Sequence, residues 1–291
     1  MKNSRSIHII SILLIICTLV TTAMGLFFKT PGTPYEVVNQ YGDVVRIYGS
    51  GLYKNDSYFM APIAKGTDFA FLFIGVPLLI ISLILDVKKA SYRSRLRLLS
   101  AISIFAYYAT SICFGITYNI LHLLYIAIFS LSIFGLIVCF RSIDEDILKE
   151  KIDGSFVTKG LYIYLFVSGI SIFVAWLPDI ATSLLHRQSL QLIEVYTTQI
   201  TYVLDMGLIS PAIFICIYSL FNNKGIGFSI LGIILMTCSI VGVSVSAGTL
   251  FQYMEGIVLP IPVLVTKVSI FIVLALISLM FNIRLYKNIK G

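Results

Sequence analysis

The stretch LHLLYIAIFSLSIFGLIVCF, Leu121 to Phe140, runs for twenty residues without an Asp, Glu, Lys or Arg. Because an α-helix rises about 1.5 Å per residue, this run covers about 30 Å, the thickness of a bilayer's hydrocarbon core. Seven similar runs fill most of the 291-residue chain, which is 58% hydrophobic, 12% charged and has a mean hydropathy of +0.96. A soluble protein of this size needs more polar surface, so the sequence predicts an integral membrane protein.

The predicted fold class is an all-α integral membrane bundle of eight transmembrane helices, forming a single domain over residues 1–291. Helices are favoured over a β-barrel because the runs are continuously apolar, whereas barrel strands are short and alternate polar with apolar residues. The predicted spans are Ile7 to Phe28, Thr67 to Leu85, Leu98 to Tyr118, Leu121 to Phe140, Leu161 to Ala181, Leu204 to Phe221, Ile226 to Thr249 and Pro262 to Phe281.

The distribution of basic residues predicts the orientation. Fifteen of the 21 fall on one side of the predicted spans, whereas the other side holds five, mostly in one long loop. Lys and Arg are concentrated in cytoplasmic loops, so both termini are predicted to be cytoplasmic. The heavy use of Ile, Lys, Asn, Tyr and Phe suggests an AT-rich prokaryotic genome, and the predicted location is the bacterial plasma membrane, with multiple passes. The excess of positive charge fits an anionic inner leaflet and does not indicate nucleic acid binding.

The loop between the first two spans, residues 29–66, is predicted to form an extracytoplasmic cap. Glu36 to Gln40 and Val44 to Tyr48 flank Tyr41-Gly42-Asp43, a pattern typical of a β-hairpin. A second extracytoplasmic segment, residues 183–203, is too polar to span the bilayer, and its leucines predict a short interfacial amphipathic helix.

Two predicted spans begin in the same way. Asp68 opens one and Pro77 interrupts it, while Asp205 opens another and Pro211 interrupts that one. A parallel duplication of four spans plus four would produce such a similarity. Acidic residues also stabilise helix N-termini as simple caps, so the two aspartates have both a functional and a structural interpretation.

Five polar residues are the candidates for a ligand-binding site in an outward-facing vestibule: Lys267, Asp205, Asp68, His122 and Asp179. Lys267 lies inside the last span, where ionisable groups are costly and usually paired or exposed to a cavity. Its partner is predicted to be Asp205, Asp179 or Glu255. The alternative is that the lysine reaches the interface by extending its long side chain.

The sequence contains none of the residue spacings that are typical of a metal site or a catalytic serine. His122 and His186 lack H-x-x-x-H or H-x-x-E-H partners, and no G-x-S-x-G occurs. We therefore predict no metal and no cofactor. The run from Gly242 to Gly248 instead suggests small residues that allow close helix packing.

The segments Thr198 to Pro211 and Tyr48 to Ser57 resemble segments of uncharacterised polytopic membrane proteins of prokaryotes. The resemblance implies the architecture and no particular chemistry, and it transfers no functional residue.

Three function classes fit these observations. The favoured one is a protein that binds or transports a small molecule, ion or lipid through the polar vestibule, since broken helices offer free backbone groups to a ligand. A membrane-embedded enzyme using His122 and the aspartates is the second, and a non-catalytic sensor or assembly factor binding an extracytoplasmic partner through the hairpin is the third. The sequence favours a non-enzyme with the lipid bilayer as its constant partner.

Overall fold

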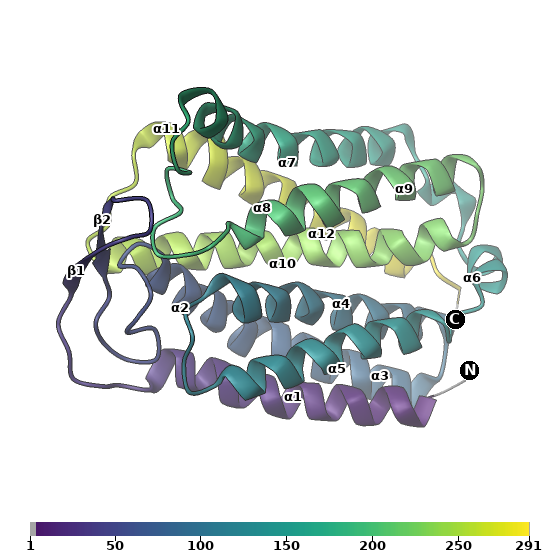
Figure 1. Ribbon diagram of the computed structural model, residues 1–291. Helices are drawn as coiled ribbons and strands as arrows, with labels where there is room; N and C mark the ends of the chain where they lie inside the picture. Colours follow the sequence, from purple (N-terminus) through teal and green to yellow (C-terminus); the bar gives the residue numbers. More distant parts are fainter. Residues whose placement is uncertain (1–3, 291) are drawn as a thin grey trace.

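The computed structural model describes residues 4–290, apart from the side chains of residues 266 and 267, and it is a helical bundle with a small two-stranded cap (Figure 1). In the described part, eight helical segments are long and apolar enough to cross a membrane. They are α1 (Ser4–Phe27), α2 to α3 (Met60–Lys89), α4 (Tyr92–Gly115), α5 (His122–Phe140), α7 (Lys159–His186), α8 to α9 (Ile200–Phe221), α10 (Ile226–Met254) and α12 (Ser269–Lys287). The prediction of a polytopic membrane protein with eight spans is confirmed.

Two of these segments contain a π-helical turn and a third such turn precedes α12; the three turns are here called η1, η3 and η4. In the first, α2 (Met60–Ala70) leads through η1 (Phe71–Gly75) into α3 (Val76–Lys89). In the second, α8 (Ile200–Leu204) leads through η3 (Asp205–Ile209) into α9 (Ser210–Phe221). In the third, α11 (Ile261–Val263) and η4 (Leu264–Val268) precede α12. Two further short helices, α6 (Glu145–Lys151) and the 3₁₀ turn η2 (Gly154–Phe156), lie between α5 and α7.

The first two π turns explain how the helices accommodate their prolines. Pro77 and Pro211 each occupy the second position of the α-helix that follows the π turn. A proline lacks the N–H group for a helical hydrogen bond, and its ring collides with the carbonyl group four residues earlier. The wider π turn relieves this collision without ending the helix. Both proline-interrupted spans therefore remain continuous helices.

The centre of the bundle is formed by α4 and α10. In each of these two helices, 67% of the residues in an apolar stretch of 18 residues are buried, compared with 28–39% in the other six spans. Helix α10 packs against α2, α4, α9 and α12, and α4 packs against α3 and α5 as well. Figure 1 shows α10 running between α1, α2 and α5 on one side and α7 and α9 on the other. The outer helices leave many large apolar side chains exposed, as expected of a surface that faces lipid.

Glycines allow α10 to lie close to its neighbours. A Cβ atom added at Gly66 of α2 would lie 2.4 Å from the backbone nitrogen of Gly248, and one added at Gly242 would lie 2.1 Å from Cβ of Ala275. Distances this short leave no room for a side chain between the helices. The predicted use of the Gly242 to Gly248 run for close packing is confirmed.

The two ends of the bundle differ. Helix α1 begins and α12 ends at one end, here called the terminal end, and the β-hairpin lies at the other, here called the hairpin end (Figure 1). Strands β1 (Tyr35–Val38) and β2 (Val44–Ile47) pair antiparallel, with Tyr35 opposite Ile47 and Val38 opposite Val44. The predicted hairpin is confirmed, and the membrane side on which it lies stays a prediction.

The hairpin is folded down onto other parts of the chain. Asn39 donates a hydrogen bond to the carbonyl oxygen of Glu194 (2.8 Å), and Gln40 donates to that of Tyr196 (3.0 Å). On the opposite side of the cap, the Tyr48 hydroxyl donates to Glu255 (2.5 Å) and accepts from Lys65 (2.5 Å). These contacts hold the cap over the helix ends.

The segment after α7 differs from its prediction. Helix α7 continues to His186, five residues beyond the predicted span, and residues 187–199 then form turns with no regular helix. The expected amphipathic helix over Leu184 to Val195 is therefore wrong. The chain instead uses this stretch as a loop that meets the hairpin, because Asn39 and Gln40 satisfy two of its backbone carbonyl groups.

Candidate functional site

A polar cleft of about 780 Å³ lies at the hairpin end, between the hairpin, the last turns of α7 and the loop that follows it. This volume falls within the range of sites for small molecules. Its walls contain Asn39, Asp43, Val44, Val45, Arg46, Tyr58, Phe59, Asp179, Thr182, Ser183, Gln188, Ser189, Leu190, Gln191, Ile193, Glu194 and Ile257. Segments far apart in the sequence thus supply one concave surface.

Acidic groups outnumber basic ones in this cleft. Asp43, Asp179 and Glu194 contribute carboxyl groups, whereas Arg46 is its one basic side chain. The Arg46 guanidinium lies 4.0 Å from the centre of the Tyr58 ring, a cation–π contact. With all four groups ionised, the cleft carries a net negative charge, which favours a cationic ligand.

Glu194 has an incompletely satisfied carboxyl group. Its backbone is in the left-handed region (φ +48°), and its Oε2 atom is buried without a hydrogen-bond partner among residues 4–290. Burial raises the pKa of Glu194 to about 7, because the anion loses its hydration. The wall of the cleft thus contains a carboxyl oxygen that no described group satisfies.

Asp179 connects the cleft to a network of polar side chains between the helices. Its Oδ2 atom accepts a hydrogen bond from the hydroxyl of Tyr202 (2.7 Å). The Tyr202 ring stacks on Trp176, with ring centres 4.7 Å apart, and Trp176 Nε1 donates to Oδ2 of Asp205 (2.9 Å). The Tyr107 hydroxyl donates to the other oxygen of Asp205 (2.9 Å). A continuous path of contacts thus leads from the cleft to a buried carboxyl group at the π turn η3.

Asp68 lies in a second, fully buried cluster. The Tyr53 hydroxyl donates to its Oδ2 atom (2.5 Å), and the Tyr108 hydroxyl donates to Oδ1 (2.7 Å). A Cβ atom added at Gly25 of α1 would lie 1.7 Å from Asp68 Oδ2, so only a glycine leaves space for this carboxyl group. The cluster joins the cap, α1, α2 and α4.

Two consecutive tyrosines of α4 donate hydrogen bonds to the two buried carboxyl groups. Tyr107 binds Asp205 and Tyr108 binds Asp68, because side chains of neighbouring helical residues diverge by about 100°. In the described part of the chain, no ion pair involves either aspartate. Two intramembrane carboxyl groups are therefore held by aromatic hydroxyl and indole groups rather than by cations.

The five predicted site residues occupy several places. Asp179 and Asp205 belong to the network behind the cleft, and Asp68 belongs to the neighbouring cluster. His122 begins α5 and packs against Tyr118 with ring centres 5.3 Å apart, and it is not among the residues that line the cleft. Lys267 falls in the π turn η4, but its side chain lies outside the described residues.

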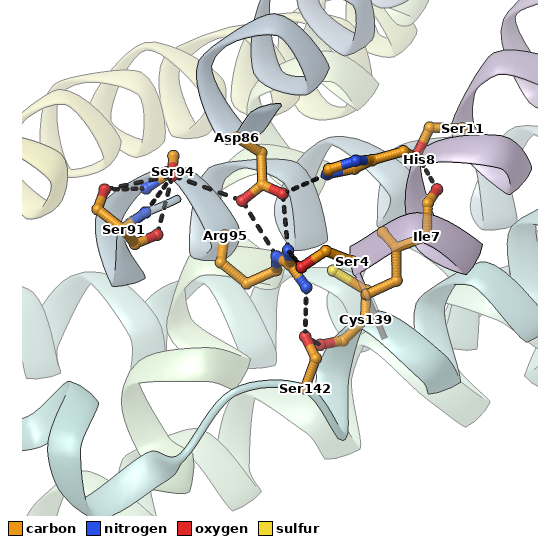
Figure 2. Close-up of polar contacts among 10 residues, drawn as sticks. All are labelled: Ser4, Ile7, His8, Ser11, Asp86, Ser91, Ser94, Arg95, Cys139 and Ser142. Carbon is orange, nitrogen blue, oxygen red and sulfur yellow. Dashed lines mark hydrogen bonds and ion pairs between the residues drawn. The ribbon is translucent and has the colours of Figure 1, made fainter. Parts of the chain in front are cut away.

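A buried charge cluster at the terminal end was not anticipated from the sequence (Figure 2). Arg95 of α4 donates from Nε to Oδ1 of Asp86 (3.0 Å) and from Nη2 to Oδ2 (2.8 Å), and both side chains are almost fully buried. His8 Nε2 lies 2.8 Å from Asp86 Oδ2. Arg95 also donates to Ser4 (2.8 Å) and Ser142 (2.9 Å).

This cluster fixes four segments to one another: α1 through Ser4 and His8, α3 through Asp86, α4 through Arg95, and the end of α5 through Ser142. Arg95 is one of the fifteen basic residues on which the predicted orientation rests. Asp86 and Arg95 lie only nine residues apart across the turn between α3 and α4, and this spacing of opposite charges was the available signal.

The aromatic partners of the aspartates have no distinguishing feature in the sequence. Such residues are common in membrane proteins, both in the core and at the interface. The partners here are Tyr53, Tyr107, Tyr108, Trp176 and Tyr202. Only the pairing of each hydroxyl or indole group with a carboxyl group distinguishes them.

No protein family, curated protein or solved structure matched the chain in the comparisons. Among the residues that the structure describes, no group of three or more His, Cys, Asp or Glu side chains is arranged to hold a metal ion. Titratable groups continue inward from the cleft, from Asp179 in its wall to Asp205 between the helices.

Proposed function

We propose that this protein binds a small cationic organic solute, such as an amine or a guanidinium compound, in the cleft at the hairpin end and carries it across the plasma membrane. In this proposal the hairpin end faces the outside and both termini face the cytoplasm. The observation that carries the proposal is that Asp179 belongs both to the cleft and to the network that leads to Asp205.

The chemistry of the cleft supports a cation as the ligand. A protonated amine or guanidinium group offers several N–H donors, and the cleft wall contains the carboxyl groups of Asp43, Asp179 and Glu194 as acceptors. Charge-assisted hydrogen bonds to carboxylates are about twice as strong as neutral ones. The apolar and aromatic walls, including Tyr58 and Phe59, suit the carbon skeleton of an organic cation.

The π turn at Asp205 supports transport rather than binding alone. Intramembrane carboxyl groups mark ion and substrate paths in membrane proteins, and π turns are frequent at functional sites. A cation that moves from Asp179 toward Asp205 would exchange one carboxylate for another. The stacked pair Trp176 and Tyr202 lies between them, because Tyr202 is hydrogen-bonded to Asp179 and Trp176 to Asp205.

The enzyme and partner-binding alternatives have less support. The enzyme alternative relied on His122 working with the aspartates, and His122 does not line the cleft. The partner-binding alternative relied on a free hairpin, whereas Asn39, Gln40 and Tyr48 attach the hairpin to other segments.

Binding is tested by titrating purified protein in nanodiscs with a panel of monoamines, diamines and guanidinium compounds, with acetate and glycerol as negative controls. We expect at least one cation to bind, and Asp179→Asn and Glu194→Gln to weaken it about tenfold or more, as for a lost charge-assisted bond. Asp146→Asn, an exposed change on α6 at the terminal end, is the matched control.

The pH dependence of binding provides a sharper test. With a pKa of about 7, Glu194 is protonated at pH 6 and ionised at pH 8. Because a cation prefers the ionised carboxylate, affinity should rise between pH 6 and pH 8 in the wild type and change less in Glu194→Gln. A panel in which no cation binds, or in which all carboxamide variants bind like the wild type, contradicts the proposal.

Transport is tested with the same solute in proteoliposomes. Asp205→Asn should retain binding at the cleft and lose uptake, because Asp205 lies behind the cleft rather than in its wall. Cysteine labelling of Lys54→Cys in intact cells establishes the orientation, and labelling from the outside is the expected result.

A further inference from the structure

We propose that a groove on the membrane-facing surface, distant from the cleft, is a specific binding site for an anionic phospholipid. The groove has a volume of about 710 Å³ and lies between α3, α10 and α12, with the first turns of α4 at one end. It extends from the terminal end along α10 and α12 past the middle of the bundle, and it shares no lining residue with the cleft.

One end of the groove is cationic. Arg93 and Arg97 of α4 and Lys287 of α12 line it there, and none of the lining residues is acidic. In the described part of the chain, no ion pair involves any of these three side chains. A cluster of basic groups without counter-charges at the membrane surface attracts the phosphate of an anionic lipid.

The two arginines are held in place by contacts that leave their charges available. Arg93 donates through Nη2 to the carbonyl oxygen of Ile289, while its Nε is buried without a partner among residues 4–290. The Arg97 guanidinium lies 4.9 Å from the centre of the Tyr286 ring, and the hydroxyl of Tyr286 is anchored on Ser100 (2.9 Å). Positioned guanidinium groups bind phosphate through paired N–H donors.

Asn282 supplies a second, independent polar group. The residue is 5% exposed, it lines the groove, and its side-chain amide nitrogen has no hydrogen-bond partner in the described structure. Buried amide donors are costly when unpaired. Asn282 lies five residues before Lys287, about 7 Å deeper along α12, where the ester carbonyl groups of a lipid would accept its hydrogen bonds.

The rest of the groove fits hydrocarbon. Beyond Asn282 the walls are mainly apolar and include Leu279, Leu276 and Ile272 of α12 and Ile240 and Val243 of α10. The ten residues from Asn282 to Ile272 span about 15 Å, half of the hydrocarbon thickness of a bilayer. A lipid with its phosphate at the arginines would therefore place its acyl chains along one leaflet. This length of apolar wall favours a lipid over a free phosphate.

The proposal is tested by native mass spectrometry of delipidated full-length protein titrated with phosphatidylglycerol or phosphatidylcholine. We expect phosphatidylglycerol to bind more tightly, and each of Arg93→Gln, Arg97→Gln and Lys287→Gln to weaken it about fivefold. Lys88→Gln and Lys89→Gln, which remove cations at the same end but outside the groove, are the matched controls and should change binding little.

A separate variant tests the hydrocarbon part of the groove. Val243→Phe fills the apolar wall without touching the cations, and it should weaken phosphatidylglycerol binding while leaving circular dichroism unchanged. It also keeps the test informative if an arginine variant fails to fold. Glycerol phosphate in millimolar excess should fail to displace the lipid.

Equal binding of both lipids, or variants that bind like the wild type, overturns the proposal. Displacement by glycerol phosphate overturns the lipid assignment and identifies an anion site instead.

Discussion

At the scale of single residues, the chain treats its buried carboxyl groups in two ways. Asp86 is paired with a buried guanidinium, whereas Asp68 and Asp205 accept hydrogen bonds from neutral hydroxyl and indole groups. A paired ion is energetically demanding to separate, because removing one partner leaves an uncompensated charge in a low-dielectric region. A neutral hydroxyl group allows the carboxyl group to change its charge or its partner. The first arrangement suits a structural role and the second suits a site.

We expect Asp86→Asn to destabilise the protein by about 3 to 5 kcal/mol, because it leaves the Arg95 guanidinium buried without its counter-charge. The double variant Asp86→Asn with Arg95→Met should recover part of this loss, since it removes both charges. Thermal unfolding in nanodiscs measures the effect, with Asp146→Asn as the control. If Asp86→Asn unfolds like the wild type, the cluster does not stabilise the fold.

At the scale of elements, the spans combine interruptions with close contacts. The π turns η1 and η3 allow Pro77 and Pro211 to remain inside continuous helices, and glycines bring α2 and α12 up to α10. Helix association in membranes depends on such packing, since lipid is as apolar as the side chains. The contact between α2 and α10 is the most informative example, because it fixes the helix that carries Asp68 against the centre of the bundle.

We expect Gly66→Ala to destabilise the protein by about 1 to 3 kcal/mol, since its methyl group would meet backbone atoms of Gly248 at 2.4 and 2.5 Å and push the helices apart. Gly207→Ala is the matched control, because it is also within a spanning segment and its added methyl group meets nothing within 4 Å. The difference between the two midpoints of thermal unfolding isolates the clash from helix propensity. Equal midpoints would show that α2 moves without cost.

At the scale of the whole molecule, the cap joins distant loops through Asp56. Its Oδ1 atom accepts from the backbone nitrogen of Thr117 (2.8 Å) and the hydroxyl of Tyr196 (3.0 Å), and its Oδ2 atom has no partner among the described residues. Burial raises the pKa of Asp56 to about 6, because the anion loses its hydration. The two hydrogen bonds lower the pKa, but their effect is smaller than that of burial. The attachment of the cap should therefore depend on pH.

The sign of this dependence follows from the raised pKa. The folded protein holds the proton of Asp56 more tightly than the unfolded chain, whose Asp pKa is 3.8. The contribution of Asp56 to stability is therefore fully present below pH 4 and is lost as pH rises through about 6. The loss amounts to about 3 kcal/mol. In Asp56→Asn, which keeps an acceptor oxygen, stability relative to the wild type should increase from pH 4 to pH 7, as measured by chemical unfolding in nanodiscs. A stability difference that is constant with pH would contradict this assignment.

The sequence by itself determined the class, the eight spans, the hairpin and the positions of the proline interruptions. Each of these depends on local chemistry: the length of an apolar run such as Leu121 to Phe140, the turn at Tyr41-Gly42-Asp43, and the missing N–H of Pro77 and Pro211. Long uninterrupted apolar runs leave the chain few alternatives, because every backbone polar group in lipid must be satisfied within its own helix.

Only the tertiary structure decided which polar groups act together. Asp179 is connected to Asp205 through contacts with Tyr202 and Trp176, while Asp68 accepts hydrogen bonds from Tyr53 and Tyr108. Arg95 pairs with a buried Asp86 instead of facing the cytoplasm as a loop cation. These contacts depend on which helix faces follow one another around α4 and α10. Apolar residues are spread evenly around each span, so the sequence pattern does not predict which side of a helix is buried. The packing of the helices against one another decides this.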